Sequence, residues 1–288
     1  MSPFHLVDEQ TIVFVVTYGD KSSLILYTLR ELDGLPQHRI TYLLPDLDHD
    51  VYASINIHAT PSFHGAAARA DLLPGHVPAL ESQIMVLEIT SPLTSGLVVI
   101  DMVIFSEQAI HSETPVEIPW SDWGPKYTWC FQHDPRNEVS VFGSKMAYTL
   151  PLWYTPWPGE KIRSPDDDDE DFYVHIWDFN QRVTARAQNP NSRDDISGCR
   201  SEGVYQPGLP FEEEIFNHRG FNAAVCRTPF PAYEMDRIFL DQDRLILTSV
   251  GALVLCMHSS HGDAACLCSV CRRLFGLFAP SMAKTFAT

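Results

Sequence analysis

Cysteine and histidine are densest near the C-terminal end of the chain, and their side chains are the ligands that zinc prefers in proteins. Four of the seven cysteines and two histidines lie within residues 256–271. The residues with suitable side chains are Cys256, His258, His261, Cys266, Cys268 and Cys271. Only Cys268 and Cys271 show the Cys-x-x-Cys spacing, and a second such pair at the usual separation is missing. We therefore predict no metal site and keep zinc as the alternative.

Compact catalytic motifs are absent from the sequence. It contains no G-x-S-x-G elbow, P-loop, dinucleotide fingerprint or H-E-x-x-H helix. His133 precedes Asp134, but adjacency along the chain does not place a carboxylate on an imidazole nitrogen, so we predict a turn there. His175 lies inside an apolar run and is predicted to be a satisfied structural residue. We predict no enzymatic activity, no catalytic residues and no cofactor. A hydrolase or metal-dependent enzyme assembled from distant residues is the alternative.

The charge balance excludes some classes of partner. Asp and Glu number 37 against 20 Lys and Arg, which gives a formal charge of -17. Such an excess repels phosphate backbones and anionic lipid surfaces, so we expect neither nucleic acid nor membrane as a partner. The N-terminus lacks the basic and apolar regions of a signal peptide, and no apolar run approaches the length that spans a bilayer. We predict a cytoplasmic or nuclear protein.

The strand that best indicates the fold is FYVHIWDFN, residues 172–180. It ends in Trp177-Asp178, as the blades of propeller proteins commonly do, and it follows an acidic run at residues 166–171. We interpret the acidic run as a solvated loop. A single Trp-Asp pair is more often part of the core than of a recognition surface, so we predict that Trp177 is buried.

A repeat of strand, short loop and strand occurs in residues 11–30, 84–105 and 244–257. Such hairpins cannot bury both faces alone, and stacking them completes a core. We therefore predict a mainly β fold, a propeller-like, incomplete stack of antiparallel hairpins with long loops. Another antiparallel β fold is the alternative, because every such fold contains hairpins.

The predicted organisation is one β-propeller-like domain over residues 1–250, followed by a poorly ordered Cys/His-containing tail over residues 251–288. Residues 187–220 contain many turn formers and few bulky side chains, so we predict a long, mobile surface loop there.

Tryptophans cluster between residues 120 and 157, and as a group they are too costly to leave in water. We predict that Trp120, Trp123 and Trp157 are binding residues that anchor a protein partner from loops at one end of the sheets. Packing in the core is the alternative for each of them.

Several ordered motifs resemble a known family. They are WSDWGPKYTWCF, SVFGSKMAYTLPLWYTPWPGE, DDFYVHIWDFN and LDQDRLILTS. The series resembles the C-terminal β-rich region of F-box proteins from mushroom-forming fungi, most specifically over residues 120–183 and 236–249. The resemblance implies a non-catalytic module that holds the substrate of a cullin ubiquitin ligase.

An F-box itself is not recognisable in this chain. The module needs about forty residues that begin with Leu-Pro and continue with helical apolar spacing, whereas a strand-like run begins at Thr11. Leu73-Pro74 is followed by Pro78, which breaks the required helix. We therefore expect a protein partner of unknown identity and no binding to the Skp-type adaptor. A non-functional fragment of the family is the remaining alternative.

Overall fold

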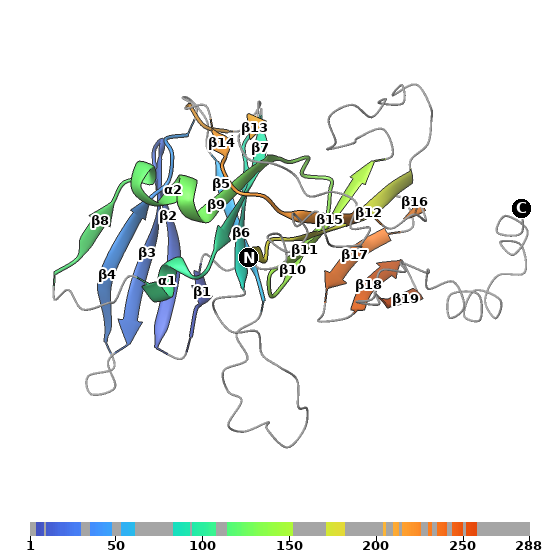
Figure 1. The fold of residues 1–288 in the computed structure, drawn as a ribbon, viewed down its shortest axis with the longest axis horizontal. Helices are drawn as coiled ribbons and strands as arrows, with labels where there is room; N and C mark the ends of the chain where they lie inside the picture. The colour runs from blue at the N-terminus through green and yellow to red at the C-terminus, as the bar shows by residue number, and fades with distance from the viewer. Residues whose placement is uncertain are drawn as a thin grey trace, which may run out of the picture.

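The fold is an open row of antiparallel sheets that follow one another in chain order (Figure 1). The computed structural model describes residues 4–8, 10–29, 35–47, 53–60, 83–92, 94–107, 114–151, 171–181, 204–205, 210–212, 215–225, 230–231, 235–240, 244–249 and 252–257. In this part of the chain the sheets do not close into a barrel or a ring.

The first sheet has five strands, and three of them form a long antiparallel meander. Its order is β1 (Phe4–Leu6), β2 (Thr11–Tyr18), β3 (Lys21–Leu29), β4 (Pro36–Leu43) and β8 (Val116–Ile118), the last parallel to β4. Gly19, with a φ of 65°, lies in the two-residue turn between β2 and β3. This left-handed conformation suits glycine and fixes the hairpin register.

The second sheet contains β5 (Ser54–Ala59), β6 (Ile84–Thr90), β7 (Ser95–Asp101) and β9 (Thr128–Gln132). Two helices are neighbours of these strands in the chain: α1 (Ile104–Glu107) follows β7, and α2 (Trp120–Tyr127) comes directly before β9. The third sheet contains β10 (Val139–Phe142), β11 (Lys145–Pro151), β12 (Asp171–Asp178) and β15 (Asn222–Val225), with β16 (Phe230–Pro231) also paired to β12. The small pair β13 (Val204–Tyr205) and β14 (Phe216–Asn217) lies between β12 and β15 in the chain.

The fourth sheet contains β17 (Met235–Leu240), β18 (Arg244–Ser249) and β19 (Ala252–Met257). The hairpin of β18 and β19 continues past residue 250, so the domain boundary predicted there falls inside a hairpin. The tail after Met257 lies outside the described residues.

Three hydrophobic clusters fill the spaces between successive sheets. One joins the first and second sheets, the next joins the second and third, and the last joins the third and fourth. On β6, Met85 and Leu87 belong to the first cluster, whereas Ile84 and Val86 belong to the second. Because β6 is covered on both faces, its sequence is a nearly continuous apolar run rather than an alternating one.

The mainly β prediction is confirmed, and all three predicted repeats form hairpins. The prediction of a mobile loop over residues 187–220 is wrong for part of that segment, because Phe211 and Ile215 are buried in the first cluster. The tryptophan-rich segment after Pro119 forms the helix α2. The acidic run before Asp171 lies outside the described residues.

Candidate functional site

Four polar side chains form a hydrogen-bonded chain between the second and third sheets. The two oxygens of Glu88 on β6 each meet an imidazole: Oε2 lies 2.8 Å from Nε2 of His58 on β5, and Oε1 lies 3.1 Å from Nε2 of His133 after β9. The Nδ1 atom of His133 lies 3.0 Å from the hydroxyl of Tyr148 on β11. The chain therefore joins three segments of the second sheet to the third.

The hydrogen-bond partners assign the direction of this chain. An ionised carboxylate only accepts, so both histidines donate from Nε2 to Glu88. In the neutral form of His133 the lone pair is then on Nδ1, which accepts the proton of the Tyr148 hydroxyl. The hydrogen bonds from His133 and then His58 hold the pKa of Glu88 well below its usual range, against the opposing effect of burial.

Tyr148, His133 and Glu88 stand in the order hydroxyl, base and carboxylate that activates nucleophiles in other proteins. The tyrosine is only 1% exposed, and the side chain of His133 has no exposed surface. The hydroxyl of Tyr148 is therefore not accessible to a substrate in this conformation. The hydrogen bonds of Tyr148 and His133 hold the second and third sheets together.

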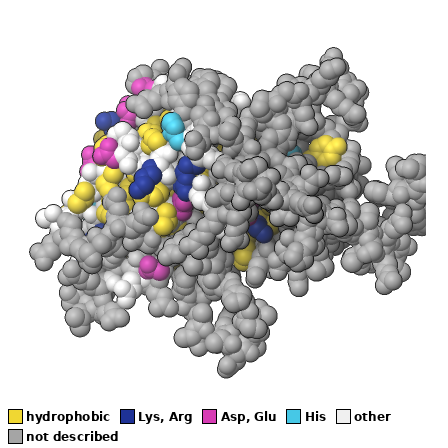
Figure 2. All heavy atoms as spheres, in the orientation of Figure 1, with side chains coloured by type: hydrophobic (Ala, Val, Ile, Leu, Met, Phe, Trp, Pro, Cys, Tyr) yellow, Lys and Arg dark blue, Asp and Glu magenta, His cyan; other side chains and the backbone are white. Residues whose placement is uncertain are grey.

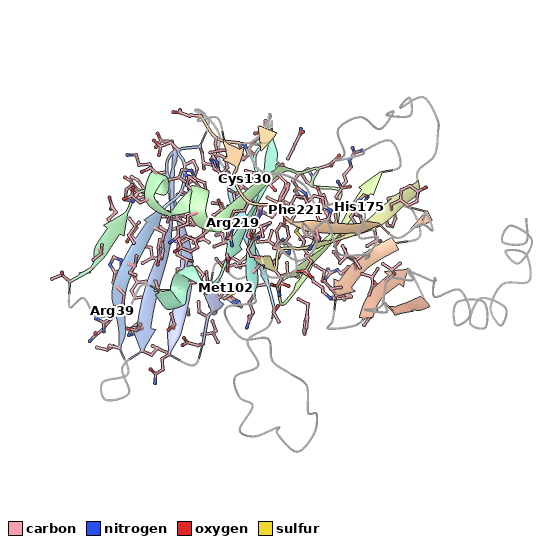
Figure 3. The ribbon with its side chains drawn as sticks, in the orientation of Figure 1. Arg39, Met102, Cys130, His175, Arg219 and Phe221 are labelled. Carbon is pink, nitrogen blue, oxygen red and sulfur yellow. The ribbon has the colours of Figure 1, made fainter. Side chains whose placement is uncertain are left out.

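His175 lies beside this polar chain. It pairs with Tyr148 across β11 and β12, so both side chains are on the same face of the third sheet. His175, labelled in Figure 3, is 4% exposed, and its Nδ1 atom has no hydrogen-bond partner among the described residues. Burial lowers the pKa of His175 to about 4. The prediction of a satisfied histidine is therefore wrong at Nδ1, because the apolar strand supplies no acceptor or donor there.

The free edge of β9 is covered by an asparagine. Asn217 on β14 accepts from the backbone N–H of Cys130 at 2.7 Å and donates to its carbonyl at 2.8 Å, as a neighbouring strand would. Nearby, Arg219 forms an ion pair with Asp101 at 2.9 Å and lies over the ring of Trp129. Cys130 and Arg219 are labelled in Figure 3. These contacts fix residues 215–221 against the second sheet.

The predicted binding tryptophans differ in their exposure. Trp123 has no exposed surface, packs against Tyr42 and donates from Nε1 to the carbonyl of Leu43 at 2.9 Å. It therefore takes the core role that was the alternative for each tryptophan. Trp120 is partly buried and lies edge-on to Trp123, with ring centroids 4.9 Å apart. Trp157 lies outside the described residues, so the binding roles of Trp120 and Trp157 stay predictions.

The outer face of the first sheet is mostly apolar, and no other sheet or helix of the described residues packs on it. We define this outer face by four cross-strand rows. They are Phe4, Phe14, Ile25, Thr41 and Glu117; Leu6, Ile12, Tyr27 and His38; Val16, Ser23 and Leu43; and Tyr18 and Lys21. None of these residues is buried. On the inner face, by contrast, Val13, Leu24 and Tyr42 have no exposed surface.

Aromatic rings on neighbouring strands of this outer face contact one another. The rings of Phe4 and Phe14 lie 5.7 Å apart, those of Phe14 and Tyr27 lie 5.4 Å apart, and Tyr27 lies 5.5 Å from His38. Phe4 is 41% exposed and Val16 is 42% exposed. Figure 2 shows one face of the molecule, and at its left, where Figure 1 places the first sheet, hydrophobic side chains lie among Lys, Arg, Asp and Glu.

Neither arrangement was predicted from the sequence. Glu88 and His58 lie 30 positions apart, and Tyr148 lies 60 positions from Glu88, so spacing alone contains no sign of the cluster. Apolar residues recur along residues 11–29 and indicate strands. The sequence does not indicate which face of these strands another sheet covers.

Comparisons with known proteins add no relative. No family model matches the sequence, and neither the curated proteins nor the solved structures include a match. Within the described ranges, no group of three or more His, Cys, Asp or Glu side chains is arranged to hold a metal ion. The described helices are all too short or too polar to cross a membrane.

Proposed function

We propose that this chain is a non-catalytic protein-interaction module and that its partner covers the outer face of the first sheet. The observation that carries the proposal is the partly exposed apolar surface on a sheet whose opposite face has a buried centre, with Val13, Leu24 and Tyr42 fully enclosed. Soluble proteins rarely leave a contiguous apolar patch of several hundred Å² in water unless another molecule binds there.

The architecture supports this role. A row of sheets packed face to face resembles blades of a propeller that has not closed, and the first sheet stands at one end of the row (Figure 1). The inner sheets have apolar side chains on both faces because both faces are covered. The first sheet has the same pattern with one face uncovered, so a further layer from a partner completes its packing.

The resemblance to the C-terminal region of fungal F-box proteins fits a module that holds another protein. In that class the β-rich region binds the substrate of a ubiquitin ligase. We propose the same role for this chain, with no direct contact to the Skp-type adaptor, because no segment with the apolar helical pattern of an F-box is recognisable.

Site-specific cross-linking in native cells tests this function. A photo-reactive amino acid at position 16 stands on the outer face, where Val16 is 42% exposed. The matched control position is 239 on the fourth sheet, where Phe239 is 46% exposed. We expect a discrete cross-linked protein from position 16, lost when Phe4→Asp is added, and no such product from position 239. Equal, diffuse products from both positions contradict the proposal.

A further inference from the structure

We draw no further inference here: the strongest candidate, the polar cluster of Glu88, His133, Tyr148 and His175 between the second and third sheets, belongs to the site already described and supports no step beyond the contacts given there.

Discussion

The Nε2 atom of His133 lies 3.1 Å from Oε1 of Glu88, and this contact ties the turn after β9 to the middle of the second sheet. His58 occupies the other oxygen of the same carboxylate at 2.8 Å. One partly buried carboxylate therefore accepts hydrogen bonds from two imidazoles of different segments. Removing it leaves two donors without an acceptor, which costs more than the loss of a single exposed ion pair.

The substitution Glu88→Gln should lower the free energy of unfolding by roughly 1.5 to 3 kcal/mol at neutral pH, as expected for hydrogen bonds to a charged group. Glutamine keeps the shape but offers one acceptor and one donor, so one imidazole N–H then faces another donor. Urea denaturation measures the change. As a control, Asp134→Asn removes only the exposed pair with Arg136 and should cost less than about 1 kcal/mol.

The same substitution should have little effect in acid. The pKa of Glu88 in the fold lies below its usual value, mainly because of the hydrogen bond from His133. Its contribution is therefore present above the unfolded pKa of about 4.3 and is lost as the pH falls below that value. A stability difference between wild type and Glu88→Gln that persists unchanged well below about pH 4 would contradict this assignment.

His175 should make the protein less stable as the pH falls from about 6.5 toward 4. Its pKa is about 4 in the fold because of burial, whereas the unfolded chain binds the proton near 6.5. The unfolded state therefore binds more protons in this interval, and stability falls by at most about 1.4 kcal/mol per pH unit from this group. Denaturation at several pH values measures the slope.

The variant His175→Gln is neutral at every pH and should flatten part of that slope. His218→Gln is the matched control, because His218 is exposed. We expect the control to retain the wild-type slope. Identical slopes in all three proteins would show that His175 takes up its proton as readily in the fold as in the unfolded chain.

The sequence predicts those parts of the fold whose pattern lies within one short segment of the chain. The hairpins of β2 with β3, β6 with β7, and β18 with β19 are local, because each has two apolar runs joined by a short connection. The helix α2 was missed because Gly124 and Pro125 lie within it and normally indicate a turn. Its burial against Tyr42 stabilises a helix that propensity alone does not favour.

The candidate sites depend on contacts between distant segments, which a single sequence does not encode visibly. Trp123 and Trp120 look alike in the sequence, yet only Trp123 is fully enclosed. His133 was correctly separated from Asp134, whose carboxylate binds Arg136. Its actual partner, Glu88, lies 45 positions earlier and becomes a neighbour only when β9 joins β7.

Asn217→Ala should separate residues 215–221 from the second sheet. The asparagine makes both a donor and an acceptor bond to the backbone of Cys130, and alanine leaves these two buried groups without partners. We expect a loss of roughly 1 to 3 kcal/mol in the free energy of unfolding. Hydrogen exchange should accelerate first at the amide of Cys130. An unchanged rate at that amide would show that the asparagine does not protect the edge of β9.

Trp177→Ala should be the most destabilising substitution in the third sheet. Trp177 is 2% exposed, and its ring lies 4.7 Å from that of Phe131 and 5.2 Å from that of Phe221. Truncation leaves a cavity between two sheets, so we expect a loss of about 3 to 5 kcal/mol. Trp177→Phe keeps an aromatic ring and removes the Nε1 donor, which has no hydrogen-bond partner in the described part of the chain. The phenylalanine variant should therefore lose much less, and a melting temperature that falls equally in both variants would place the stabilisation in the indole nitrogen instead of the packing.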